Sequence, residues 1–428
     1  MRHWAISLTL ALAIGIGPAA FAQPSQPSLR DIYVRGLTAY SEGDMDGFLL
    51  AMEEVAEIRP HQWSVRYNVA AGHALTGDTE GAVERLEAMA DGGLYVNVVT
   101  ESDFASLQDH PRYDALLAQM AALLEPSGDD TLVHEFDVVG LMPEGLAVDE
   151  ATGAMYISSI REGRIWRVSP GGTLENFVRP DTHEGIGGLF GMAVDGARGV
   201  LWVTSSTPGQ YIGPHAEAAP PSALFGFDLS TGDVRHYFPL DGDRHFLGEV
   251  VIGPDGGVYA SDSLDPVIYR LSDDMNALEP YFAADQYTNL QGFDFAGDGR
   301  IYVADYIHGI GLADVAAGTL TPLMAADGTS LIGVDGLFYA DGALIVIRNG
   351  VQPHRIMRLE MAEDGTSVTQ SRVLVNRLLL WDEPTLGQII DGHLIYNAAS
   401  GWPSFLDDGT VAEGADLAPI RIMSVAID

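Results

Sequence analysis

The chain has 428 residues, of which 47% are hydrophobic, enough for two domains that each bury an apolar core. Its 60 acidic and 22 basic residues give a formal net charge of −38, which would repel nucleic acid and anionic membrane surfaces. The absence of cysteine excludes disulfides, thiolate metal sites and cysteine nucleophiles. Such an acidic surface is compatible with plain solubility or with the binding of divalent cations.

The first 22 residues have the pattern of a cleavable signal peptide. Arg2 and His3 form a short basic lead, the stretch from Trp4 to Ile16 is mostly apolar, and Ala20-Phe21-Ala22 is a small-x-small cleavage site. No other stretch is apolar for long enough to span a membrane, and without cysteine the mature end cannot carry a lipid. The sequence therefore predicts a soluble mature protein, periplasmic or secreted, that begins near Gln23.

Residues 29–125 are predicted to form a small all-α domain, because apolar residues recur there at helical spacing. Two Gly-Asp turns, Gly43-Asp44 and Gly77-Asp78, are 34 residues apart, and this period resembles the tetratricopeptide repeat. Such helical pairs form a concave face that recruits a peptide or protein partner, or the domain simply packs on its neighbour. Residues 126–130 have the composition of a linker.

Residues 131–428 contain one β-sheet unit six times, which predicts a six-bladed β-propeller. Each unit has a glycine step into an apolar strand, then a turn, then a strand of aromatic and β-branched residues. The six steps are Glu144-Gly145, Phe190-Gly191, Gly248-Glu249, Gln291-Gly292, Asp335-Gly336 and Leu386-Gly387. The last unit lacks its outer strand, so residues 131–137 are expected to pair with it and close the ring.

The first residue of each step, which precedes the glycine in all units but the third, is expected beside the central axis, since the first strand of a blade lies innermost. This brings Glu144, Gln291 and Asp335 together with Glu249. Carboxylates confined in a narrow channel repel one another, and a divalent cation with oxygen ligands would relieve this. Calcium fits best and magnesium is second, whereas zinc is disfavoured because the ring has no histidine. The alternative is a channel in which these groups bind each other and water.

Further polar residues are expected in the loops that open on the same face as this ring. These pocket candidates are Asp262, Asp305, His308, Arg348, Asn349, His354 and Trp402. Two long stretches, 207–222 and 400–419, are available as pocket walls or lids. The sequence does not choose between His308 and His354 as a functional histidine.

The glycine steps of the first, fourth and fifth units resemble those of the senescence marker protein, gluconolactonase and luciferin-regenerating enzyme family over residues 131–428. The resemblance implies one divalent cation held by Glu144, Gln291 and Asp335, with Asp335 also the general base, and hydrolysis of a sugar lactone. Two positions depart from the family pattern. Gln291 stands where the family prefers Asn, and Gly248-Glu249 replaces an Asn-Asp pair that holds substrate, which weakens the expectation of a sugar lactone.

Two functions follow as hypotheses. The first is an exported metal-dependent hydrolase of a lactone or related ester, which needs no serine nucleophile and agrees with the absence of a Gly-x-Ser-x-Gly elbow. The second is a non-catalytic propeller that binds a ligand, with a structural cation and a helical domain that recruits a protein or peptide partner.

Overall fold

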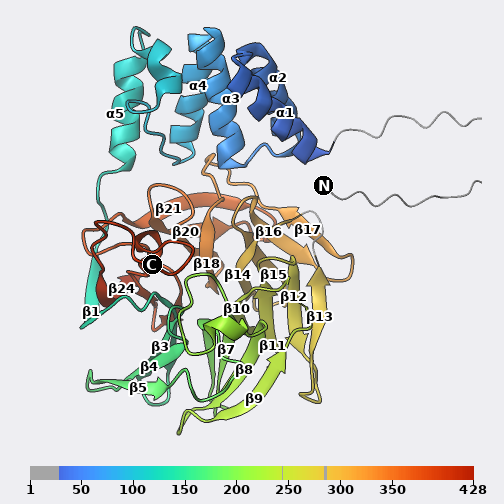
Figure 1. The fold of residues 1–428 in the computed structure, drawn as a ribbon, viewed down its shortest axis with the longest axis vertical. Coiled ribbons are helices and arrows are strands. Elements are labelled where there is room, and N and C mark those ends of the chain that lie inside the picture. Colours follow the sequence, from blue (N-terminus) through green and yellow to red (C-terminus); the bar gives the residue numbers. More distant parts are fainter. Residues whose placement is uncertain (1–27, 243, 284–286) are drawn as a thin grey trace, which may run out of the picture.

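The computed structural model describes residues 28–242, 244–283 and 287–428. The predicted signal peptide at residues 1–22 lies outside the described residues. Of the helices in the described ranges, none is long and apolar enough to cross a membrane. Figure 1 shows a group of helices standing on one side of a larger body of strands.

The helices occupy the N-terminal part of the described chain. They are α1 (Leu29–Glu42), α2 (Met45–Ile58), α3 (Trp63–Thr76), α4 (Thr79–Asp91), the short 3-10 helix η1 (Ser102–Leu107) and α5 (Tyr113–Leu123). Gly43 and Gly77 end α1 and α3 in the left-handed conformation, with φ of 81° and 91°. Asp44 and Asp78 then cap the next helix through their side chains. The two predicted helix–turn–helix pairs are therefore confirmed, while their kinship to the tetratricopeptide repeat stays a prediction.

The strands of the described residues form six four-stranded antiparallel sheets, as predicted for a six-bladed propeller. The first blade has β2 (Pro143–Asp149), β3 (Ala154–Ser159), β4 (Arg164–Val168) and β5 (Leu174–Val178). The second has β6 (Gly188–Asp195), β7 (Val200–Ser206), β8 (Ala223–Asp228) and β9 (Val234–Pro239). The third has β10 (Leu247–Ile252), β11 (Val258–Asp262), β12 (Val267–Leu271) and β13 (Leu278–Ala283).

The second half of the ring repeats the pattern. The fourth blade has β14 (Leu290–Phe295), β15 (Ile301–Asp305), β16 (Gly309–Asp314) and β17 (Thr319–Pro322). The fifth has β18 (Val334–Ala340), β19 (Ala343–Arg348), β20 (Arg355–Met361) and β21 (Val368–Asn376). The sixth has β22 (Gly387–Ile390), β23 (His393–Asn397), β24 (Pro419–Ala426) and, as its outer strand, β1 (Asp130–Val139).

Strands from the two ends of the propeller sequence close the ring. β1 pairs antiparallel with β24, with Thr131 opposite Ser424 and Phe136 opposite Ile420. A buried hydroxyl fixes the start of β1, because Tyr396 donates a hydrogen bond of 2.6 Å to the Asp130 carboxylate. The predicted closure is confirmed, and the last blade has no unpaired outer edge at β24.

The glycine steps allow neighbouring blades to approach closely at the axis. A Cβ on Gly145 would lie 2.2 Å from the carbonyl oxygen of Phe190 in the next blade, and one on Gly292 would lie 2.4 Å from that of Asp335. In five of the six first strands the register shifts at this step, as in a β-bulge. Bulges re-aim side chains, so the step both packs the blades and turns a side chain toward the axis.

The helical domain packs on the fifth blade and on the loop that precedes it. Arg348, fully buried at the end of β19, donates a hydrogen bond of 2.8 Å to the carbonyl of Gly93 after α4. Arg355 donates one of 3.4 Å to the carbonyl of Leu123 at the end of α5. Carbonyls at helix C-termini carry partial negative charge, so they compensate guanidinium groups that have no acidic partner in the described chain. Ile332 of the propeller joins the apolar core of the helices.

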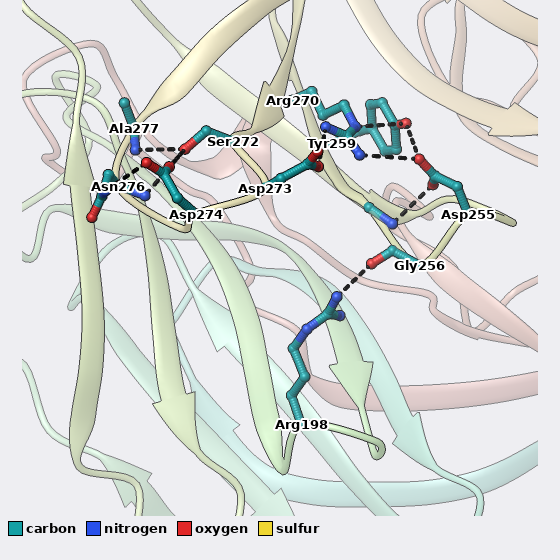
Figure 2. A network of polar contacts seen from close by, with 11 residues as sticks. Arg198, Asp255, Gly256, Tyr259, Arg270, Ser272, Asp273, Asp274, Asn276 and Ala277 are labelled. Atoms are coloured by element: carbon teal, nitrogen blue, oxygen red, sulfur yellow. Dashed lines mark hydrogen bonds and ion pairs between the residues drawn. The ribbon is translucent and has the colours of Figure 1, made fainter.

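Polar contacts also join neighbouring blades at the turns that follow their first strands. Figure 2 shows Arg198, between β6 and β7, donating to the carbonyl of Gly256, between β10 and β11, at 2.8 Å. In the same network Asp255 accepts hydrogen bonds from Tyr259 at 2.9 Å and from Arg270 at 3.3 Å. These turns lie at the opposite ends of the first strands from the glycine steps, so both ends of the blades are held together.

Replacement of Tyr396 by Phe should weaken ring closure. The change leaves the partly buried Asp130 carboxylate without its hydroxyl donor, so we expect the free energy of unfolding to fall by about 1–2 kcal/mol. The measurement is the midpoint of denaturant unfolding. Tyr281→Phe is the matched control, because no hydrogen bond to the Tyr281 hydroxyl is seen in the described chain. Equal midpoints for the two variants would contradict the assigned role of this contact.

Candidate active site

A cavity of about 450 Å³ lies where the first strands meet. All six positions that were predicted to surround the axis line it, namely Glu144, Phe190, Gly248, Gln291, Asp335 and Leu386. Glu249, predicted beside Gly248, lines it as well. The repeat in the sequence therefore located the cavity. The polar part of its lining includes Glu144, Glu249, Gln291 and Asp335, the residues that the sequence predicted to lie together.

The cavity has further walls that come from loops. Glu383 precedes the sixth blade, Tyr306 follows β15, Asn289 precedes β14, and Trp402 stands in the loop at 400–419 that was expected to form a wall. Sequence reasoning missed Glu383, Tyr306 and Asn289 as lining residues. The available signal was their position, since each lies within four residues of a strand end on the face of the glycine steps.

Asp335 is held in one orientation by its neighbours. Asn349, just after β19, donates hydrogen bonds from its side-chain nitrogen to Asp335 Oδ2 at 2.7 Å and to the carbonyl of Pro384 at 2.9 Å. The hydroxyl of Tyr306 donates to the Asn349 side-chain oxygen at 3.0 Å. Asn349 was a predicted pocket candidate, and in the structure it is hydrogen-bonded to Asp335. Both its amide groups are occupied, so its orientation is fixed.

The other carboxyl groups have fewer partners. Trp402 donates from its indole nitrogen to Glu144 Oε2 at 3.1 Å, and the backbone amide of Val250 donates to Glu249 Oε1 at 2.9 Å. Gln291, which lines the cavity, donates from its side-chain nitrogen to the side-chain oxygen of Asn289, and no described residue donates to its side-chain oxygen. No salt bridge to these carboxyl groups is found in the described chain.

Burial and mutual repulsion make the carboxyl groups of this cavity hard to ionise. Burial, and then the neighbouring Asp335 charge, raise the pKa of Glu144 well above its ordinary value. Burial raises the pKa of Asp335 to about 6 and that of Glu249 to about 8. Burial and the Asp335 charge raise the pKa of Glu383 to about 8. None of the described lining residues is basic. Some of these carboxyl groups therefore stay protonated at pH 7 unless a bound cation compensates their negative charge.

Asp262 and Asp305, two predicted pocket candidates, do not line the cavity but hold segments that do. Asp262 accepts hydrogen bonds from the backbone amides of Phe246 and Leu264, which both line it. Asp305 accepts one from the amide of Asn289 at 2.9 Å. Each carboxylate is fully buried and also contacts a histidine, His245 or His308, at 2.7 Å. These residues therefore order the cavity rim.

His308, Arg348 and His354 lie at the junction with the helical domain and not in the central cavity. Arg348 binds the helical domain as described above, His308 lines a separate cavity with His61, and His354 lines another with Tyr95. The prediction placed these side chains in one pocket because their loops open on the cavity face. The helical domain covers this part of the face, over the fourth and fifth blades. These three side chains therefore lie against the helical domain or in the cavities beside it.

The donor set of the central cavity suits a hard cation. In the described residues no group of three or more His, Cys, Asp or Glu side chains is arranged to hold a metal ion. The predicted set of Glu144, Gln291 and Asp335 contains two carboxylates and one amide, so it is a different kind of site. Its oxygen donors, the repulsion between Glu144 and Asp335, and the lack of a basic lining residue fit calcium or magnesium better than zinc.

No protein-family model matches the chain, and no curated protein matches it. Several solved structures are similar to it. The luciferin-regenerating enzyme is 14% identical with a TM-score of 0.48, over 71% of this chain and 95% of that one. A gluconolactonase from Xanthomonas campestris is 16% identical with a TM-score of 0.47, over 72% and 92%. An aldose sugar dehydrogenase from Streptomyces coelicolor, bound to PQQ, is 16% identical with a TM-score of 0.47, over 71% and 99%. Similarity at this level carries no argument about the reaction.

The raised pKa values predict how stability depends on pH when no divalent cation is present. Glu249 and Glu383 have pKa values of about 8 in the folded protein against an ordinary 4.5, so the folded state binds more protons than the unfolded state between these values. The free energy of unfolding should therefore fall as the pH rises through this window. Glu249→Gln and Glu383→Gln should each reduce the fall by about 1–2 kcal/mol, less than the full shift because cavity water screens the charge.

Denaturant unfolding in EDTA at pH 5 and pH 9 measures this effect. Glu279→Gln is the control, because Glu279 is exposed on β13. A pH dependence that is the same in all three variants and the parent would contradict the assignment of protons to this cavity.

Proposed function

We propose that the central cavity hydrolyses a lactone or a related ester. The observation that supports this most is the contrast between Asp335 and its neighbours. Asn349 orients Asp335, and in the absence of a bound cation burial raises the pKa of Asp335 to about 6 and the pKa values of Glu249 and Glu383 to about 8. Asp335 is therefore the first of these three carboxyl groups to ionise as the pH rises, which suits it to act as the base in general acid–base hydrolysis.

The reaction follows from these roles. Asp335 accepts a proton from a water molecule whose oxygen forms a bond to the carbonyl carbon of the substrate. The bond between that carbon and the leaving oxygen then breaks, and the leaving oxygen takes a proton from Glu249 or Glu383. The products are a carboxylic acid and an alcohol, which in a lactone remain one molecule. Phe190, Leu386 and Trp402 supply the less polar wall against which the substrate packs.

We propose a divalent cation as part of this site, with calcium first and magnesium second. Glu144, Gln291 and Asp335 would hold it through oxygen atoms. When bound, the cation supplies a Lewis acid that polarises the carbonyl and offsets the negative charge of the carboxylates. Gln291 supports the assignment, since it lines the cavity and its side-chain nitrogen is bound to Asn289, while no donor among the described residues binds its oxygen.

We also propose that the protein is exported to the periplasm or secreted, from the signal-peptide pattern in residues 1–22. The N-terminal sequence of the protein purified from its natural host tests this. A first residue near position 23 supports export, and an intact N-terminus contradicts it.

The second candidate function is a binding protein in which the cation is structural and the helical domain recruits a partner. The departures at Gln291 and at Gly248-Glu249 favour it, because they change positions that hold metal and substrate in the family that the sequence resembles. The presence of a second domain on the cavity face also favours it, since such a surface adds contacts for a ligand.

Replacement of Asp335 by Asn should reduce kcat/KM by at least about 100-fold, because the proposed base is lost. The measurement is hydrolysis of a panel of γ- and δ-lactones and aryl acetates with calcium present. Asn349→Leu should lower kcat and move the lower limb of the pH profile to higher pH, because the hydrogen bond from Asn349 orients Asp335 and lowers its pKa. Glu279→Gln is the control. Stoichiometric calcium without turnover on any substrate would favour the binding protein instead.

A further inference from the structure

A second cavity, of about 360 Å³, lies between the helical domain and the propeller. Trp63 and Tyr67 of α3 and Tyr95 after α4 form its helical side, and the loop at residues 349–352 forms its propeller side. Neither the proposed hydrolysis nor the proposed metal site uses this cavity. We refer to it below as the aromatic cavity.

Two of the three rings of the aromatic cavity pack against other rings, and all three keep exposed surface. Trp63 and Tyr67 are one helical turn apart and stack with ring centroids 5.2 Å apart and planes inclined by 19°. Tyr67 also meets the edge of Phe104 at 5.4 Å and 78°. The backbone amide of Tyr95 donates to the carbonyl of Gln352 at 2.9 Å, which ties the main chain at Tyr95 to the propeller loop. All three side chains are only half-buried, so ring surface is left for a ligand.

The charge of the aromatic cavity is negative. Glu101 lies on its rim, where it accepts a hydrogen bond of 3.2 Å from the Tyr67 hydroxyl. None of the described residues that line the cavity is basic, and its other polar groups are the amides of Asn97, Asn349 and Gln352. Burial, and then the negative charges of Glu101 and Asp103, raise the pKa of the Tyr67 hydroxyl, in agreement with a negative potential at this end of the cavity.

We propose that the aromatic cavity binds an organic cation with a methylated ammonium group. The faces of Trp and Tyr attract a cation through their ring quadrupoles, and methylated ammonium groups are the cations that shed water most readily in such sites. Glu101 adds a charge of the opposite sign at the rim. A neutral apolar ligand would use the rings but gain nothing from Glu101, and a simple metal ion would gain little from the rings. An alkylated ammonium ion gains from both the rings and the carboxylate.

This proposal is independent of the proposed hydrolysis, although one residue lies in both cavities. Asn349 lines the aromatic cavity and also donates the hydrogen bond to Asp335 in the central cavity. A ligand in the aromatic cavity would contact both domains, since its walls come from α3 and from the loop after β19.

Isothermal titration of the full chain with choline tests the proposal, with 3,3-dimethyl-1-butanol as a neutral probe of the same shape. Choline should bind at least about tenfold more tightly than the neutral probe. Trp63→Ala should abolish measurable binding, whereas Trp63→Phe, which keeps an aromatic face, should retain most of it. Glu101→Gln should weaken choline binding a few-fold and reduce its dependence on salt without changing the binding of the neutral probe.

Three outcomes would overturn the proposal. The first is no choline binding to the parent protein, and the second is equal affinity for choline and the neutral probe. The third is binding that survives Trp63→Ala but is lost in Glu249→Gln/Glu383→Gln, which would place the ammonium group in the central cavity. Circular dichroism and the melting temperature of each variant separate loss of the site from loss of the fold. None of these measurements depends on turnover, so a negative result for choline binding can be told apart from a negative result for the proposed hydrolysis.

Discussion

The close approach of neighbouring first strands around one axis, at three of the six steps, is the constraint on which the propeller and its cavity depend. Gly145, Gly191 and Gly292 each pack against a carbonyl oxygen of the next blade, at distances that would leave 2.2–2.7 Å for a Cβ atom. Only glycine fits there. The register shift at these steps turns the preceding side chain into the cavity. Packing of the blades and the choice of cavity residues are therefore set by the same backbone feature.

This arrangement concentrates carboxyl groups where solvation is poor. Burial opposes ionisation of Glu144, Glu249, Asp335 and Glu383, and no basic residue of the described lining offsets their charge. A fold under no functional pressure would fill such an axis with apolar or neutral side chains, as it does at Phe190 and Leu386. The cost of the acidic groups is tolerated if they bind a cation, transfer protons, or do both. The hydrolase and the binding protein share this explanation and differ only in whether Asp335 acts as a base.

The sequence predicted what its repeats encode. The glycine steps located the six first strands and the axial residues, and the missing outer strand of the last unit predicted the pairing of β1 with β24. It did not predict Glu383, which lies in a loop outside the repeat. Tyr306 was missed although it follows β15 as Asn349 follows β19, so the repeat did carry a signal for it. The prediction that Arg348 lies in the pocket was wrong for a different reason. Its strand position is correct, but whether it meets a substrate or a helix depends on which blades the helical domain covers, and no local pattern encodes this.

The end of β19 connects the two domains with the central cavity. Successive side chains of a strand point to opposite sides, so Arg348 and Asn349 face different partners. Arg348 donates to the carbonyl of Gly93 in the helical domain, and Asn349 donates to Asp335. One peptide bond therefore separates the residue that binds the helical domain from the residue that orients Asp335. None of the described side chains of the helical domain lines the central cavity.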